Sequence, residues 1–486
     1  MVTPKINTTA LILLACLLFV LQTLPLLSFR WVEDESWYSA TGFGLLHEGQ
    51  VRNVAFLPTE PESVADTRPL AMPATLAATM ATLGFGPARE RFPGWLSCLA
   101  LIPLVFWIGK ALGSPEAGVI SAFLVSVETT VFMAGRTVRP EAFVALFGAT
   151  AVLLYFLSQQ RQSTGLAILC GLALGIACNY HVNGFGIAAS IGLLLLGEFG
   201  LSVWRQKRAW AIVLTCVAML IPFFVWLQGD PARMQAFHLL YGRGSTQTVA
   251  NIVHWEVIRY KDYIGIANQR FRLIPFPLPL RLHVVLLYVT GFAILAWKRR
   301  PVFWKLLALI LPSILMWPKE VNPTFRFFVV VTPYLVLAVG MAFTALETPK
   351  WRRLLALWCL LAVITQAGGN AIILAKSRSA DYNSVARQLR SIIPAGARVY
   401  GALTFFLALH DHTYYAWNRG TLDDAIKLGV NYLILNDRVL VNGSGFGSED
   451  WREVRERANA FVETHADLIG HVPDPFYGDL QIYRVK

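Results

Sequence analysis

The chain has 486 residues, of which 55% are hydrophobic and only 15% are charged. A soluble domain usually carries about 25% charged residues, so this composition excludes a soluble enzyme, a disordered protein and a fibrous repeat. It predicts an α-helical polytopic membrane protein, and the net charge of +12 then reflects topology and contact with anionic membrane lipid rather than nucleic-acid binding.

Apolar runs long enough to cross a bilayer, about 20 residues each, recur along the chain. The first, 9–29, is too long for a signal-peptide core, so we interpret it as a retained anchor. Ten further spans are predicted after it, at 92–109, 117–133, 142–157, 165–179, 185–203, 209–227, 282–297, 302–317, 327–346 and 354–374. Only a short break separates 165–179 from 185–203, so these are two spans or one long helix.

The loops between alternate spans are short and rich in Lys and Arg, which is typical of loops on the cytoplasmic side. This pattern places the N-terminus inside and predicts a transmembrane module over 1–374, with long outer loops at 30–91 and 228–281. Residues 375–486 then form a small extracytoplasmic α/β domain. Its expected elements are a helix at 385–392, strands at 398–403 and 432–435, and a helix at 451–464.

Three adjacent carboxylates, Glu33, Asp34 and Glu35, directly follow the first span. A carboxylate at a membrane surface can act as a general base toward an acceptor hydroxyl or amine. From the residues alone, a solvated acidic loop anchored by Trp37 and Tyr38 is the favoured alternative, because acidic loops are common.

Two arginines, Arg136 and Arg139, precede Pro140 and Glu141 in a short outer turn. Proline and an acid at these positions form an ordinary helix start, which explains Pro140 and Glu141 but not the arginines. Guanidinium groups are suited to holding a phosphate through paired hydrogen bonds. Both interpretations remain open from the residues alone.

Further polar residues lie where outer loops meet spans. Arg326 and Lys319 precede the tenth span, where Arg326 either snorkels to the interface or binds an anionic headgroup. His181 lies in the turn between two short spans, as a structural residue or a ligand. Glu128 lies inside the third span and is expected to pair with a basic neighbour.

Together these motifs resemble the GT-C superfamily of membrane glycosyltransferases, and within it the bacterial branch related to protein O-mannosyltransferases and to the aminoarabinose transferases of lipid A. The matching motifs, in chain order, are Asp34-Glu35, Thr67-Arg68-Pro69-Leu70, Ala88-Arg89-Glu90-Arg91-Phe92-Pro93, Gly135 to Glu141, and Arg326-Phe327-Phe328 with Pro333. The chain departs from the family pattern at Arg68-Pro69-Leu70, where His-Pro-Pro or Lys-Pro-Pro is usual. It also departs at His181-Val182-Asn183, where Thr-Lys often stands.

The resemblance implies a glycosyltransferase that moves a hexose or pentose from a polyprenyl-phosphate donor to a lipid, glycan or protein, with inversion, at the outer face of the bacterial cytoplasmic membrane. It implies that Asp34 is the catalytic base and that Glu35 assists it. It also implies donor or phosphate contacts, for which the candidates are Arg68, Arg136, Arg139, Glu141, His181, Lys319 and Arg326.

No cofactor is predicted with certainty. If a divalent metal ion is used, its ligands would be Asp34, Glu35 and Glu141, although carboxylates alone do not identify a metal. The alternative function is a polytopic transporter or lipid flippase, which usually shows paired internal repeats with broken helices. A third class is a membrane scaffold with a binding tail, which has no need of acids and arginines gathered on one side.

Overall fold

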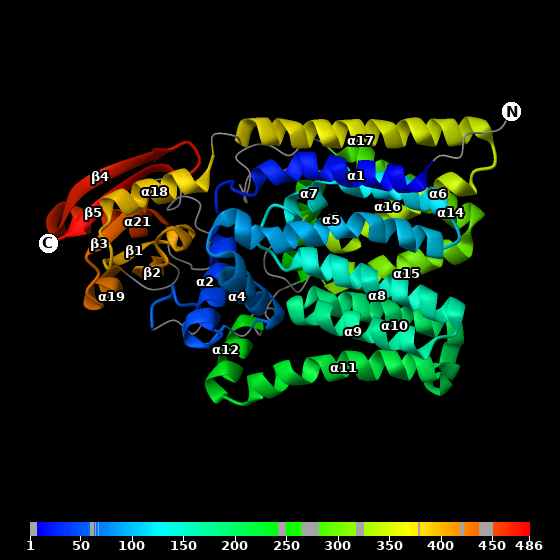
Figure 1. Cartoon of the computed structure of the whole chain (residues 1–486), viewed down its shortest axis with the longest axis horizontal. Helices are drawn as coiled ribbons and strands as arrows, with labels where there is room; N and C mark the ends of the chain where they lie inside the picture. The colour runs from blue at the N-terminus through cyan, green and yellow to red at the C-terminus, as the bar shows by residue number, and fades with distance from the viewer. Residues whose placement is uncertain are drawn as a thin grey trace.

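A computed structural model of the chain describes residues 7–486 apart from 59–62, 64, 67, 242–248, 265–280, 317–324, 378–379, 418–421 and 437–450. Most of the chain forms a bundle of roughly parallel and antiparallel helices, and a small sheet domain caps one end of the bundle (Figure 1). The N-terminus lies at the opposite end. We call these the tail end and the far end of the bundle.

Eleven helices of the bundle coincide with the eleven predicted spans. They are α1 (Thr8–Thr23), α5 (Pro87–Ala111), α6 (Pro115–Val127), α8 (Glu141–Arg161), α9 (Thr164–Tyr180), α10 (Asn183–Phe199), α11 (Lys207–Gln228), α14 (Leu282–Lys298), α15 (Arg300–Met316), α16 (Phe328–Ala345) and α17 (Pro349–Ser377). Within the described residues, 7 helical segments are long and apolar enough to cross a membrane, and α6, α9 and α14 are among the shorter apolar ones. The predicted fold class, a polytopic helical bundle with a small α/β tail, is therefore confirmed.

The uncertain stretch 165–203 is two helices. His181 adopts an extended backbone, with φ −161° and ψ 152°, and this ends α9 two residues before α10 begins. The Nδ1 atom of His181 accepts a hydrogen bond from the backbone N–H of Asn183 at 3.2 Å, which stabilises the turn. The chain therefore reverses here, as the eleven-span prediction requires.

The third span differs from its prediction because it breaks at Glu128. This residue leaves the helical region, with φ −61° and ψ 128°, and separates α6 from the short helix α7 (Thr129–Ala134). Its carboxylate accepts a hydrogen bond from the backbone N–H of Thr130 at 2.5 Å and so caps α7. An acid inside an apolar run therefore ends one helix and starts the next.

The outer loops carry helices of their own. The 3₁₀ turn η1 (Leu24–Leu26) leads from α1 toward α2 (Glu33–Glu48), which packs on α4 (Ala71–Leu83), and both lie across the tail end of the bundle (Figure 1). The loop after α11 carries α12 (Pro231–Tyr241) and α13 (Val249–Ile264), and the 3₁₀ turn η5 (Phe325–Phe327) precedes α16. At the far end, η2 (Gly200–Arg205) joins α10 to α11.

The tail contains one five-stranded sheet in the order β2-β1-β3-β5-β4. Its strands are β1 (Arg398–Ala402), β2 (Thr413–Trp417), β3 (Tyr432–Asn436), β4 (Ala466–Asp474) and β5 (Gly478–Val485). Strand β1 is parallel to β2 and β3, whereas β5 is antiparallel to both β3 and β4. The other elements are α18 (Tyr382–Ile392), η6 (Leu403–Phe405), η7 (Leu407–Leu409), α19 (Leu422–Lys427) and α21 (Trp451–His465). All four tail elements expected from the sequence are present.

The tail is attached to the chain segment that leaves α1. Phe29 forms an isolated antiparallel bridge with Asp381, and a buried ion pair joins Arg30 to Asp474. The hydroxyl of Tyr477 donates a hydrogen bond to the carbonyl of Trp31 at 2.6 Å. The segment before α2 is therefore held between the bundle and the tail.

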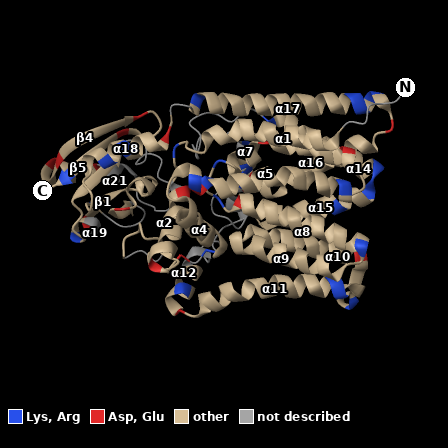
Figure 2. Ribbon diagram, viewed as in Figure 1, with Lys and Arg blue, Asp and Glu red and all other residues tan. Residues whose placement is uncertain are grey.

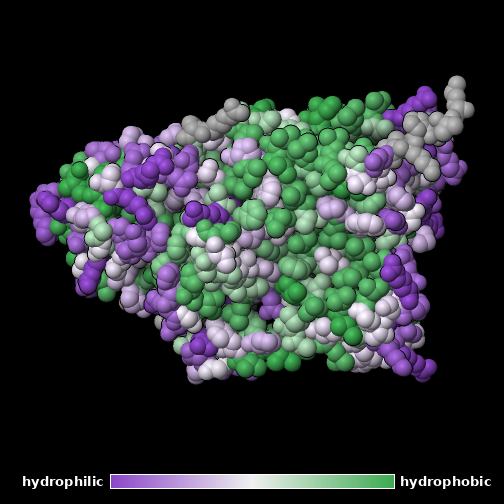
Figure 3. Space-filling view, in the orientation of Figure 1, coloured by the Kyte–Doolittle hydropathy of each residue, from purple (hydrophilic) through white to green (hydrophobic). Residues whose placement is uncertain are grey.

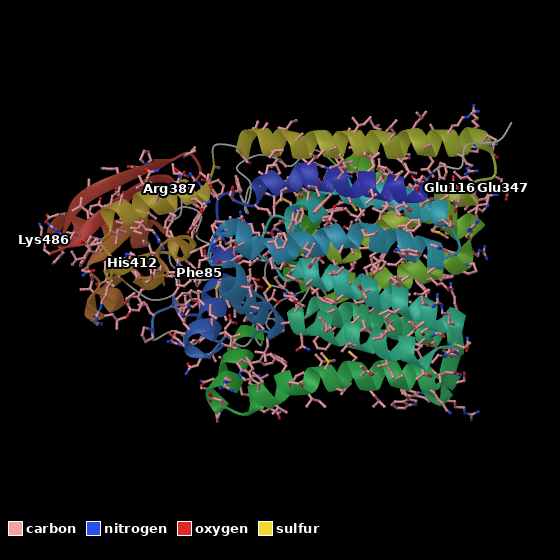
Figure 4. All side chains as sticks on the ribbon, in the orientation of Figure 1. Phe85, Glu116, Glu347, Arg387, His412 and Lys486 are labelled. Atoms are coloured by element: carbon pink, nitrogen blue, oxygen red, sulfur yellow. The ribbon has the colours of Figure 1, made fainter. Side chains whose placement is uncertain are left out.

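Charge and hydropathy follow the same axis. Lys and Arg residues gather in the turns at the far end of the bundle (Figure 2). The side of the bundle shows a broad hydrophobic surface between more hydrophilic ends (Figure 3). Glu116 and Glu347 lie at the far end and Arg387, His412 and Lys486 in the tail (Figure 4), so the polar groups occupy both ends of an apolar belt.

Candidate active site

Asp34 lies in the first turn of α2 at the tail end of the bundle, where its side chain meets two arginines. Its Oδ2 atom accepts a hydrogen bond from Nη1 of Arg139 at 2.7 Å and another from Nη1 of Arg326 at 2.9 Å. The side chain of Asp34 is 45% exposed, whereas those of Arg139 and Arg326 are only 10% and 9% exposed. The carboxylate is therefore the solvent-facing member of this group.

A second carboxylate, Glu141, closes the group from the buried side. Arg139 donates to it from Nη2 at 2.7 Å and from Nε at 3.2 Å, which is the paired geometry typical of a strong guanidinium–carboxylate contact. We call Asp34, Arg139, Glu141 and Arg326 the ion cluster. Burial disfavours the charged form of Asp34, but Arg139 and Arg326 outweigh this effect and hold the pKa of Asp34 well below its ordinary value.

Glu35 follows Asp34 in the sequence but has a different environment, since neighbouring residues of a helix point about 100° apart. It is fully buried, and Arg91 of α5 donates to both of its oxygens, at 2.8 Å and 2.6 Å. The backbone N–H groups of Val138 and Val32 also donate to it, at 2.8 Å and 3.1 Å. Glu35 thus ties α2 to α5 and to the turn that carries Arg139, and so positions Asp34.

Arg68 lies beside the ion cluster on an aromatic surface. Its guanidinium carbon is 4.0 Å from the ring centroid of Trp37 and 5.0 Å from that of Tyr38. Asp66 lies 3.8 Å from its Nη1 atom and also accepts a hydrogen bond from the Trp37 indole at 3.1 Å. A cation flanked by two aromatic rings is suited to a sugar or an anion.

The other candidates differ in position. His181 lies beside the cluster, with its ring centroid 5.8 Å from that of Phe327. Arg136 is buried but points elsewhere, because its Nε and Nη2 atoms contact the sulfur of Met133 at 3.3 Å and 3.1 Å. Lys319 lies outside the described residues. The structure therefore gathers Asp34, Glu141, Arg139, Arg326, Arg68 and His181, and separates Arg136 from them.

A second buried ion pair, deeper in the bundle, joins Glu128 to Arg281. The hydroxyl of Tyr263 in α13 donates to Glu128 at 3.4 Å, and Arg281 lies 4.4 Å above the Tyr263 ring. The sequence suggested that Glu128 has a basic partner but did not identify Arg281, since 153 residues separate the two. Arg259 of α13 was also not selected, although it is buried with its guanidinium 5.7 Å from the ring of Phe327.

The ion cluster does not fit a divalent metal ion. Asp34 and Glu141 both direct oxygens to Arg139, and a guanidinium between two carboxylates disfavours a further cation there. Glu35 has its oxygens occupied by Arg91 and two backbone N–H groups. Across the described ranges, no group of three or more His, Cys, Asp or Glu side chains is arranged to hold a metal ion.

Comparisons with known proteins bear on the fold that carries this arrangement. Residues 67–226 match a family model described as dolichyl-phosphate-mannose-protein mannosyltransferase. No curated protein matches the chain by sequence. In structure, the chain is similar to ArnT from Cupriavidus metallidurans, with 12% sequence identity and a TM-score of 0.65 over 98% of this chain and 97% of that one.

Two further structures share the architecture. The oligosaccharyltransferase of Archaeoglobus fulgidus has 13% identity and a TM-score of 0.59, over 90% of this chain and 70% of that one. The arabinofuranosyltransferase AftD from Mycobacteria has 14% identity and a TM-score of 0.55, over 98% of this chain and 40% of that one. The chain has the GT-C fold. The fold that the motif resemblance implies is confirmed, and nothing in these comparisons supports a transporter or flippase.

Proposed function

We propose that the protein is a membrane glycosyltransferase that moves a hexose or pentose from a polyprenyl-phosphate donor to an acceptor. The observation that carries this proposal is the ion cluster, in which a half-exposed carboxylate lies directly against two buried arginines. A transferase of this kind needs a base for the acceptor and cations for the leaving phosphate at one place. Asp34 supplies the base, and Arg139 and Arg326 supply the cations at 2.7 Å and 2.9 Å from its carboxylate.

In the proposed reaction, the hydroxyl oxygen of the acceptor attacks the anomeric carbon of the sugar. Asp34 accepts the proton that this hydroxyl loses. The bond between that carbon and the phosphate oxygen breaks, and the electron pair leaves with the polyprenyl phosphate. Arg139 and Arg326 stabilise the negative charge that grows on this phosphate. Because Asp34 is the exposed carboxylate and Glu141 is buried, with side chains 45% and 1% exposed, only one carboxylate faces the substrates, and a single displacement with inversion is the simplest chemistry.

The remaining candidates take positioning and binding roles. Glu35 anchors the turn of α2 that carries Asp34, and Glu141 orients Arg139. Arg68, with Trp37 and Tyr38, forms the surface on which the sugar rests. We do not assign Arg136 to the phosphate, since it contacts Met133 instead.

The carrier lipid is proposed from the structural relatives. ArnT from Cupriavidus metallidurans has been solved bound to undecaprenyl phosphate, and AglB from Archaeoglobus fulgidus in complex with an inhibitory peptide and a dolichol-phosphate. A polyprenyl phosphate is the corresponding partner of this chain, and the acceptor is a lipid, a glycan or a protein. The basic far end (Figure 2) favours placing the ion cluster and the tail on the extracytoplasmic side of a bacterial inner membrane.

Asp34→Asn tests the proposed chemistry, because it keeps the shape of the side chain and removes the basic oxygen. General base catalysis typically contributes about 10²–10⁴, so turnover should fall by about 100-fold or more. Mass spectrometry of lipids and glycans in a strain lacking the protein should first identify the missing glycosylated product. Wild-type protein should restore this product, and Asp34→Asn should not.

Glu48→Gln is the matched control, since Glu48 is exposed at the other end of α2 and pairs with Arg52 at 2.6 Å. It should restore the product fully. Normal restoration by Asp34→Asn at normal expression would contradict the assignment of the base. Loss of a transported solute, with every glycan intact, would favour the transporter alternative instead.

A further inference from the structure

The contacts that Asp34 makes in the structure oppose its proposed function as a general base. One oxygen, Oδ2, accepts from Arg139 and from Arg326 at the same time. Two cations beside a carboxylate favour its charged form and therefore weaken its affinity for a proton. A general base is most effective when its pKa lies near the working pH. The observed pairing with two cations therefore weakens Asp34 as a base.

The exposed fractions of the three side chains indicate which of them an incoming anion reaches first. Asp34 is 45% exposed, whereas the two guanidinium side chains beneath it are 10% and 9% exposed. An anion that approaches these arginines from solvent therefore encounters the carboxylate before it reaches them. The carboxylate and a phosphate have similar requirements, since both accept paired hydrogen bonds from guanidinium groups.

Charge balance favours an exchange of partners. The ion cluster contains two acids and two arginines and is formally neutral, and Glu141 holds Arg139 through two hydrogen bonds. Arg139 therefore keeps its position if Asp34 is displaced. A phosphodiester donor brings one negative charge, and the phosphate monoester that leaves carries up to two. The arginines thus gain more from the phosphate as the reaction proceeds.

We propose that Asp34 and the donor phosphate compete for Arg139 and Arg326, so that donor binding replaces the carboxylate and frees Asp34 to accept the acceptor's proton. This inference rests on the proposed function. It makes the base available only when the sugar donor is in place. If the acceptor binds before the donor, Asp34 is still paired with the two arginines. The acceptor hydroxyl then keeps its proton.

The test is the affinity for undecaprenyl phosphate, which lacks the sugar, so that turnover does not affect binding. The wild-type protein and its variants are placed in phosphatidylcholine nanodiscs, and binding is measured at pH 7.5. Asp34→Asn removes the competing charge and should bind about threefold to thirtyfold more tightly, in line with couplings between charges of one network. The same variant loses turnover, a combination that a purely structural role of Asp34 does not produce.

Two comparisons complete the experiment. Glu48→Gln should bind like the wild type, because Glu48 lies at the other end of α2. Asp34→Ser also removes the charge and should bind undecaprenyl phosphate more tightly than the wild type. It replaces Asp34→Asn in the experiment if that variant does not fold. If both Asp34 variants bind with wild-type affinity or more weakly, the exchange is wrong and the proposed function stands. If the wild type itself does not bind undecaprenyl phosphate, the proposed function fails.

Discussion

At the residue scale, adjacent acids in the sequence have different roles in the structure. Asp34 and Glu35 are chemically alike, so the carboxylate type did not select between them, and only the family resemblance predicted Asp34 as the base. The distinction comes from Arg91, 56 residues away, which buries Glu35 in a paired contact and leaves Asp34 toward solvent. Local sequence patterns do not specify such a partner, because it depends on how α2 packs against α5.

The two arginines of the turn before α8 are separated in the same way. We expect Arg139→Lys and Arg326→Lys to lower kcat/KM for the donor by about 10-fold to 100-fold, since lysine keeps the charge but loses the planar pair of donors. Arg136→Lys should change kcat/KM for the donor by less than about threefold, because Arg136 contacts Met133. Donor kinetics of the three folded variants provide the measurement. Equal losses of kcat/KM in all three variants would indicate that Arg136 also binds the donor phosphate.

At the element scale, the helices were largely predictable and the breaks within them were only partly so. Long apolar runs specify spans because each must cover the same apolar thickness. The sequence left open whether 165–203 is two spans or one long helix, because only a short polar stretch around His181 separates the two apolar runs. The break at Glu128 was missed, since the carboxylate that ends α6 is stabilised by Arg281 from a distant loop.

This second ion pair should matter for stability. Removing one partner of a buried pair leaves the other charge uncompensated, so Arg281→Met should lower the free energy of unfolding by about 3 kcal/mol or more. Adding Glu128→Gln to Arg281→Met should recover most of the loss. Thermal unfolding in detergent is the measurement, and Arg352→Met is the control, since its pair with Glu116 is exposed and worth about 0–1 kcal/mol. Equal losses from Arg281→Met and Arg352→Met would contradict this view.

At the scale of the whole molecule, the sequence predicted both parts of the chain but not how they meet. The contact between Arg30 and Asp474 joins residues 444 positions apart. In a second contact, His410 of the tail stacks on Phe85 at the turn before α5, with ring centroids 4.3 Å apart (Phe85 is labelled in Figure 4). Neither contact follows from the local patterns that identified the spans and the tail helices.

The histidine contact makes the attachment of the tail sensitive to pH. Burial lowers the pKa of His410, and the nearby charge of Arg390 adds to the effect. A folded-state pKa below the ordinary value of about 6.5 means that the unfolded state binds the proton more readily, so stability falls as pH drops below about 6.5. Between pH 7.5 and 5.5, His410→Gln should lose less thermal stability than the wild type. His471→Gln, in an exposed hairpin, should behave like the wild type.

The orientation of the whole molecule is the broadest prediction. The turns at the far end contain basic residues, among them Arg161 at the end of α8 and Lys207 at the start of α11. Short basic loops remain in the cytoplasm, so the ion cluster and the tail belong outside. Alkaline phosphatase fused after Ser377 should be active, and green fluorescent protein fused after Gln162 should fluoresce. The opposite pattern would place the ion cluster in the cytoplasm, away from an extracytoplasmic donor, and with eleven spans it would place the N-terminus outside.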